Sequence, residues 1–364
     1  MTLFVKWVVL AILKKLSLHD LKPYYHVPGA IHSEGITFVK ETGTLLWVDI
    51  FKGEVHKVED IEQPESSHSF FSIVRANYGK NASIEYPPNP DELKESVGCI
   101  FPILDGASQN EIKQVLFGSK FGIGKLDFSK SEWEYVILYS ECPELSTDRA
   151  YKLRSNDGNV SPDGKYIYVG LMSDFPFDLE PIGCLLRVDL SAHKIELVWN
   201  CLLIPNAIHW DESDQKTMYV TDSLNFTIWK CPGGDLLKRD ELIDVKNSNN
   251  QSFESPEPDG SAIWFSKDGK HSGFLFITVW STSKVQMFDL TNGKLLKEFI
   301  LPERTPRVSC CCFVGKDLFV TTANAEINDA VRTNTDKNGG CIYRIPNVLD
   351  GNVPLESTKR QPLH

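Results

Sequence analysis

The chain has 364 residues, of which 41% are hydrophobic and 24% are charged, and its formal net charge is −11. This composition is typical of a folded globular protein and argues against wholesale disorder. The acidic balance disfavours nucleic acid as a partner, because phosphate binding needs concentrated Lys and Arg.

The N-terminus carries a short apolar run at residues 4–13, interrupted only by Lys6. The run is shorter than the roughly 20 residues that cross a bilayer, so we expect no integral membrane span. No small-residue cleavage site follows it, and we therefore expect residues 1–22 to form an extension packed on the domain. The nine cysteines include no Cys-x-x-Cys pair and are typical of buried thiols in a reducing compartment. Together these features predict a cytoplasmic protein, with a secretory signal as the alternative.

Six apolar strands, each followed by a second strand that ends in a polar turn, recur along the chain. One aromatic residue marks each copy, with spacings of 70, 51, 51, 57 and 43: Trp47, Phe117, Tyr168, Tyr219, Phe276 and Phe319. A period near fifty built only from strands indicates a repeat architecture in which each unit buries its face against its neighbours. The sequence therefore predicts an all-β fold, a six-bladed β-propeller.

We expect residues 23–364 to form this single propeller domain. Residues 24–27 are a candidate strand that completes the last blade from the N-terminal side and leaves no free edge. The longest spacing points to a surface insertion at about 60–97, which is rich in Pro and acidic residues. A second, shorter loop is expected at 234–258.

Several copies begin with an acid or amide beside a small residue: Ser33-Glu34-Gly35, Asn156-Asp157-Gly158, Pro205-Asn206-Ala207 and Pro258-Asp259-Gly260. Any one of these is also a common turn sequence. Their register repeats, since Asn156 and Asn206 are 50 residues apart and Asn206 and Asp259 are 53 apart. The innermost strand of each blade lines the central channel, so equivalent positions converge on the axis.

Two carboxylates and an amide oxygen meeting in a channel repel and desolvate one another unless a cation lies between them. We therefore expect Glu34, Asn206 and Asp259 to bind one divalent metal ion. Oxygen ligands favour Ca²⁺ or Mg²⁺, with Mn²⁺ and Zn²⁺ as alternatives.

These motifs resemble the signature blocks of the SMP-30/gluconolactonase/regucalcin family. The resemblance extends from about Tyr24 to the last blade and rests on the following blocks: Glu34-Gly35-Ile36, Leu46-Trp47-Val48-Asp49-Ile50, Arg154-x-Asn156-Asp157-Gly158, Pro205-Asn206, Tyr219-Val220-Thr221-Asp222-Ser223 and Pro258-Asp259-Gly260. It implies a propeller with one catalytic divalent metal that hydrolyses sugar lactones. Carried over by position, it implies metal ligands at Glu34, Asn206 and Asp259 and substrate contacts from Arg154 and Asn156.

The mechanism that this predicts is attack of a metal-activated water on the lactone carbonyl, with Asp259 as the catalytic base. A salt bridge from Arg154 to Asp148 or Asp157 is the structural alternative for that arginine. A metal-dependent esterase or phosphotriesterase and a non-catalytic calcium-binding propeller are the alternative functions. The sequence leaves the native metal, the lactone and the oligomeric state open.

The remaining aromatic and imidazole side chains are expected to serve packing. His32 and His209 lie beside predicted strands, and Trp280 lies within a strand pattern. No Ser-His-Asp arrangement at a nucleophile elbow is present in the sequence.

Overall fold

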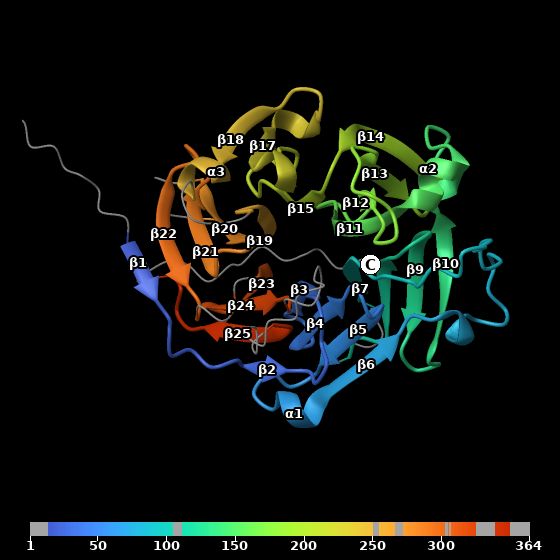
Figure 1. The fold of residues 1–364 in the computed structure, drawn as a ribbon, viewed down its shortest axis with the longest axis horizontal. Coiled ribbons are helices and arrows are strands. Elements are labelled where there is room, and N and C mark those ends of the chain that lie inside the picture. The colour runs from blue at the N-terminus through green and yellow to red at the C-terminus, as the bar shows by residue number, and fades with distance from the viewer. Residues whose placement is uncertain are drawn as a thin grey trace, which may run out of the picture.

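The protein is a ring of six small sheets around a central axis. The structure is a computed structural model, and it describes residues 14–104, 111–249, 255–265, 272–302, 305, 307–324 and 339–349. Figure 1 looks down the ring, with the first strand of each sheet nearest the centre. The predicted six-bladed β-propeller is confirmed.

Apart from two N-terminal strands that join the fifth and sixth sheets, the strands of each blade are antiparallel and follow one another along the chain from the axis outward. The first three sheets contain β3 (Ser33–Val39), β4 (Thr44–Asp49), β5 (Glu54–Val58) and β6 (His68–Ser72); β7 (Cys99–Ile103), β8 (Gln114–Gly118), β9 (Gly122–Asp127) and β10 (Glu132–Leu138); and β11 (Leu153–Val160), β12 (Ile167–Ser173), β13 (Gly183–Asp189) and β14 (Lys194–Leu202). The other three contain β15 (Pro205–Trp210), β16 (Met218–Asp222), β17 (Thr227–Cys231) and β18 (Asp240–Asp244); β19 (Pro258–Phe265), β20 (Gly273–Val279), β21 (Lys284–Asp289) and β22 (Leu295–Ile300); and β23 (Val308–Val314), β24 (Asp317–Thr322) and β25 (Cys341–Ile345).

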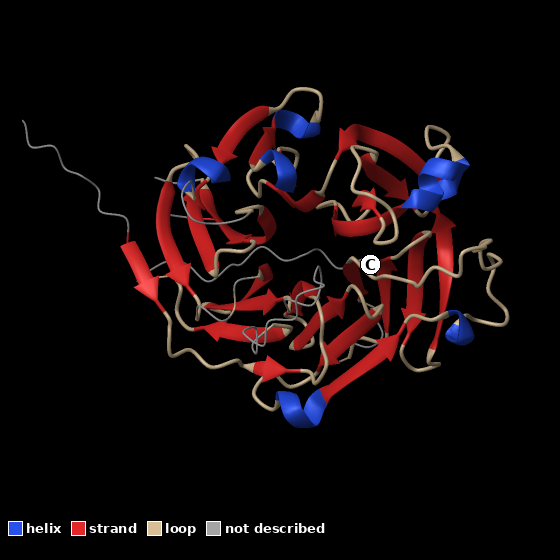
Figure 2. Ribbon diagram, in the orientation of Figure 1, coloured by secondary structure: helices blue, strands red, loops and turns tan. Residues whose placement is uncertain are grey.

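Helices are short and lie between strands or at the rim of the ring, as Figure 2 shows. They are α1 (Pro64–Ser67), α2 (Thr147–Lys152) and α3 (Val245–Ser248), with 3₁₀ turns η1 (Arg75–Asn77), η2 (Tyr139–Glu141), η3 (Ser223–Asn225) and η4 (Pro232–Gly234).

The second strand of a blade is buried on both faces, because each blade packs between two others. Every residue of β4 and of β20 is buried. A strand covered on both faces reads as a continuous apolar run. This burial explains why the sequence alone revealed the six repeats.

The N-terminal segment closes the ring. The strand β2 (Tyr25–His26) pairs with β25, with Tyr25 opposite Ile342. Tyr24 stacks edge-on against Phe319 at 4.9 Å, and its hydroxyl donates to the Ile61 carbonyl at 2.6 Å. The predicted strand at 24–27 therefore does complete the last blade, and the first and last parts of the chain share one sheet.

Three segments differ from the sequence-based expectation. Within the expected extension, β1 (Lys14–Ser17) is a strand that pairs in parallel with β22, while residues 1–13 lie outside the described residues. The expected insertion at 60–97 contains α1 and β6, so the blade itself continues to Ser72. Likewise β18 and α3 lie within 234–258. The strands β6 and β18 escaped notice because neither contains the buried apolar run that marks the second strands.

Among the described residues, no helix is long and apolar enough to cross a bilayer.

Candidate metal centre

The candidate ligands lie at the start of the inner strands, each next to a β-bulge. Glu34, Asn206 and Asp259 are each the second residue of their strand. The register between the first and second strand shifts between Glu34 and Thr37 in β3, between Pro205 and Ile208 in β15, and between Pro258 and Ser261 in β19. A bulge bends the strand and re-aims a side chain. The paired motif of a polar and a small residue thus builds one local geometry in several blades.

The residue that follows each candidate ligand is small for a steric reason. Gly35 adopts φ +58°, a conformation that L side chains rarely take. A Cβ on Gly260 would lie only 2.5 Å from the sulfur of Cys310 in the next inner strand. Small residues here allow adjacent blades to approach closely around the axis.

Asn206 and Asp259 meet across the boundary between the fourth and fifth blades. The amide Nδ2 of Asn206 donates to Oδ1 of Asp259 at 2.5 Å and to Oγ of Ser223 at 3.2 Å. Burial raises the pKa of Asp259 well above its usual range, and the negative charge of Glu34 raises it further, while the hydrogen bond from Asn206 opposes both. The structure thus brings these three predicted residues into one electrostatic environment.

Glu34 is buried and accepts a hydrogen bond from the backbone N–H of Gly35. Its charge also acts on Arg154, which lies on the third blade. Within the described ranges, no group of three or more His, Cys, Asp or Glu side chains forms a metal cluster. The expected set instead contains two carboxylates and one amide.

Arg154 is buried and lies under an aromatic ring. Its guanidinium carbon is 4.2 Å from the ring centroid of Phe175, and Nη1 donates to the Ser155 carbonyl at 2.7 Å. Nε is 3.9 Å from Oδ1 of Asp174. Burial lowers the pKa of Arg154 to about 10, against the opposing attraction of Asp174 and Glu34. The acid beside Arg154 is thus Asp174, rather than Asp148 or Asp157.

Asn156 joins the third and fourth blades. Its Nδ2 donates to the Pro205 carbonyl at 3.0 Å, and its Oδ1 lies 3.4 Å from Nη1 of Arg154. The adjacent Asp157 accepts from the backbone N–H of Gly158 at 2.7 Å. Asn156 is therefore fixed between Arg154 and the strand that carries Asn206.

A buried lysine behind Arg154 was not anticipated from the sequence. Lys120 is fully buried, with its Nζ 3.3 Å from Oδ2 of Asp174 and 2.8 Å from the Leu153 carbonyl. Burial lowers the pKa of Lys120, and Asp174 opposes this shift. Asp174 thus lies between two cations, and this arrangement holds Arg154 in place.

His32 is a second unanticipated feature. Burial lowers its pKa to about 3, and the charges of Arg154 and Arg307 lower it further. His32 therefore carries a neutral imidazole at neutral pH. His32 lies two positions before Glu34. Side chains two positions apart in an extended chain point to the same side, so this spacing is the sequence signal that links His32 to the candidate ligand.

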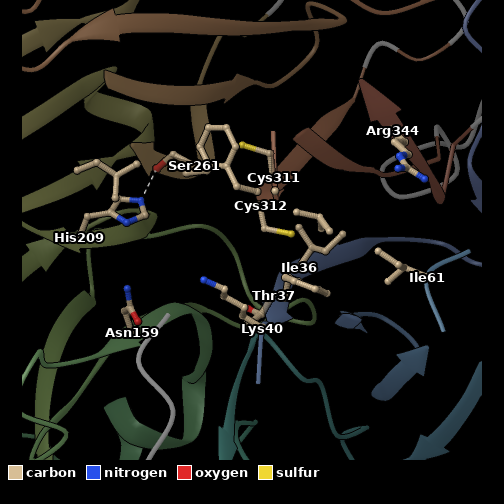
Figure 3. A pocket seen from close by; sticks show the side chains of 16 residues that line it. Ile36, Thr37, Lys40, Ile61, Asn159, His209, Ser261, Cys311, Cys312 and Arg344 are labelled. Atoms are coloured by element: carbon tan, nitrogen blue, oxygen red, sulfur yellow. Dashed lines mark hydrogen bonds between the residues drawn. The ribbon is translucent and has the colours of Figure 1, made fainter. Parts of the chain in front are cut away.

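A separate cavity of about 510 Å³ lies where the inner strands end, away from the candidate ligands. It is lined by residues of five inner strands, β3, β11, β15, β19 and β23, among them Thr37, Asn159, His209 and Ser261. None of the predicted site residues lines it. Figure 3 shows His209 and Ser261 facing one another across the blades, and Nε2 of His209 is 2.9 Å from Oγ of Ser261.

A model of the SMP-30/gluconolactonase/LRE-like region matches residues 32–324, which span every candidate ligand. The chain belongs to the SMP-30/gluconolactonase family. The resemblance predicted from the sequence motifs is confirmed.

Relatives of this SMP-30/gluconolactonase family member include an uncharacterized protein of Saccharomyces cerevisiae, which is 98% identical over 351 residues, 96% of this chain and 98% of that one. Two solved structures share the fold of this chain. A calcium-binding protein, regucalcin, from Agrobacterium tumefaciens has a TM-score of 0.69 at 18% identity and covers 96% of this chain and 99% of its own. A gluconolactonase from Xanthomonas campestris has a TM-score of 0.55 at 16% identity, with coverage of 91% and 89%.

Proposed function

We propose that this protein is a divalent-metal-dependent hydrolase that opens lactones. The observation that carries the proposal is that Asn206 donates a hydrogen bond to Asp259 from the neighbouring blade while the charge of Glu34 acts on the same buried carboxyl. Membership of a family that includes gluconolactonases supports the same reaction.

The residues present fit a hard divalent cation. Burial and the charge of Glu34 both work against ionisation of Asp259. A cation between the two carboxylates relieves this repulsion, and carboxylate and amide oxygens are ligands that Ca²⁺ and Mg²⁺ accept. We assign Glu34, Asn206 and Asp259 as the residues that hold the ion. When bound, the ion supplies polarisation of the lactone carbonyl and a water of lowered pKa.

The chain's own residues then have separate tasks. Asp259 accepts the proton of the attacking water, at hydrogen-bond range. Arg154 supplies positive charge against the oxyanion that develops on the carbonyl, and Lys120 and Asp174 behind it keep the guanidinium in position. Asn156, anchored on the Pro205 carbonyl, orients the substrate beside Asn206.

The test is hydrolysis of an aldonolactone panel by chelator-treated protein reloaded in turn with Ca²⁺, Mg²⁺, Mn²⁺ or Zn²⁺. We expect acid release with at least one metal and none in Asp259→Ala, which should remain folded. Absence of turnover with all four metals would overturn the proposal. If tight calcium binding persisted in that case, the result would favour the alternative of a non-catalytic calcium-binding propeller, the property named for the Agrobacterium regucalcin.

The thiol chemistry supports a cytoplasmic location. Seven of the nine cysteines are buried, and the sequence has no Cys-x-x-Cys pair. Buried cysteines of this kind are typical of proteins from reducing compartments. Fluorescence microscopy of the tagged full chain tests this location.

A further inference from the structure

Four rings gather at the end of the axis that carries the candidate ligands. We call His32, Phe51, Phe175 and Trp280 the mouth cluster. Phe51 and Phe175 stack at 3.9 Å with an interplanar angle of 23°. The His32 ring lies 6.0 Å from Phe51 and 5.4 Å from Trp280. Phe51, Phe175 and Trp280 each follow the second strand of a blade, so three different blades contribute to one aromatic surface.

Part of this surface faces solvent. Phe175 is 43% exposed, a large fraction for a phenylalanine beside buried polar residues. Phe51 and Trp280 are partly buried. Exposed rings that form one contiguous group mark a binding surface more often than scattered apolar residues do.

The polar atoms beneath the rings lack partners. Both ring nitrogens of His32 and Nε of Arg154 are buried and make no hydrogen bond to any described residue. A buried polar atom without a hydrogen bond is costly, so such atoms call for a ligand or an ordered water. A ring N–H of His32 can donate to the carbonyl oxygen of an ester or lactone, a group that only accepts hydrogen bonds.

Two arginines flank the rings. The guanidinium carbon of Arg154 is 4.2 Å from the Phe175 centroid, and that of Arg307 is 5.7 Å from the Trp280 centroid. The mouth cluster is therefore aromatic and lies between two cationic side chains. This combination is complementary to a planar apolar group that bears a carbonyl or a carboxylate.

A polyhydroxylated sugar needs a polar partner for each hydroxyl that it buries. Asp174, the acid next to Phe175, is already held between Lys120 and Arg154, and Phe175 covers one face of the Arg154 guanidinium. We propose that the mouth cluster selects aryl-substituted lactones or esters, stacking their planar ring on Phe51, Phe175 and Trp280 while His32 hydrogen-bonds the ester group. This inference rests on the proposed hydrolase function.

The test compares two lactones, dihydrocoumarin, whose lactone is fused to a benzene ring, and glucono-δ-lactone. The full chain, loaded with its most active metal, should have the higher kcat/KM for dihydrocoumarin. In Phe175→Leu and Trp280→Leu the ratio of the two kcat/KM values should fall about 3- to 10-fold, the loss expected for one ring contact. Phe70→Leu is the matched control, since Phe70 is 54% exposed on the outer strand β6 and should leave the ratio unchanged.

A binding measurement separates this inference from the proposed function. Isothermal titration with 3-(2-hydroxyphenyl)propionate, the ring-opened product, should show binding that weakens in the same two variants, while gluconate binds more weakly. If the variants keep the wild-type ratio and affinity, the aromatic selection is wrong even when lactones are hydrolysed. If neither lactone is hydrolysed but the product still binds through Phe175 and Trp280, the cluster stands and the hydrolase proposal fails.

Discussion

The amide of Asn206 donates a hydrogen bond to Asp259 across two blades, with Nδ2 2.5 Å from Oδ1. The two residues are 53 positions apart in the chain, and the packing of two neighbouring blades brings them together. This contact is the centre of the candidate site.

Asp259→Asn should lower kcat/KM for lactone hydrolysis about 10³-fold, because the amide neither accepts a proton nor carries a charge toward a cation. Initial rates on the best lactone of the panel measure this loss. Circular dichroism should show an unchanged fold. A variant that retains more than a tenth of wild-type activity would remove Asp259 from the mechanism.

The same substitution should stabilise the metal-free protein at neutral and higher pH. The pKa of Asp259 is raised in the folded state, so the folded state retains a proton that the unfolded chain loses above the ordinary Asp pKa. Wild-type stability therefore falls as pH rises through this range, and Asp259→Asn removes that loss. Thermal unfolding should give a higher Tm for the variant at pH 8 and a smaller difference at pH 4. Equal Tm differences at both pH values would contradict a raised pKa for the buried Asp259 carboxyl.

Divalent cations should raise the Tm of the chelator-treated wild-type protein. A ligand at 100 times its Kd stabilises a folded protein by about 2.7 kcal/mol, which corresponds to roughly 4 °C for a chain of this size. Differential scanning calorimetry with each metal in turn measures the shift. Asp259→Asn serves as the control and should respond much less. An equal shift in both proteins would locate cation binding elsewhere.

Lys120→Met should destabilise the protein by about 3 kcal/mol, since it leaves Asp174 with a charge in a buried site. The double variant Lys120→Met/Asp174→Asn should recover part of that loss because the charge is removed with its partner. Urea unfolding of the two variants and of Asp174→Asn completes a double-mutant cycle. Strict additivity would show that the pair is not coupled.

His32 should make stability depend on pH in the acidic range. Its pKa is about 3 in the folded state and near 6.5 in the unfolded chain, so protonation of the unfolded chain costs stability as pH falls below 6.5. The contribution lost at pH 5 is about 2 kcal/mol. His32→Gln should therefore narrow the difference in unfolding free energy between pH 7 and pH 5. The same difference in wild type and variant would mean that His32 titrates normally in the folded protein.

The main features of the fold were readable from the sequence because they arise from local pattern. The doubly buried second strands, such as β4 and β20, read as apolar runs, and their recurrence gave the number of blades. The closing strand at Tyr25 was also expected, since a ring needs its edge paired. Outer strands such as β6 were taken for loops because they contain no buried apolar run.

The candidate ligands were found by register, because bulges at equivalent places in β3, β15 and β19 require the same pair of polar and small residues. Tertiary structure alone decided which side chains surround them. Lys120 lies between β8 and β9, and Asp174 and Phe175 follow β12. Nothing in this spacing links them to Arg154. Trp280, expected to pack in a strand, lies in the mouth cluster instead. The pattern of a strand depends on residues that are neighbours in the chain, so the sequence alone determined the blades. Contacts around the axis depend on how six blades pack together, so only the tertiary structure decided them.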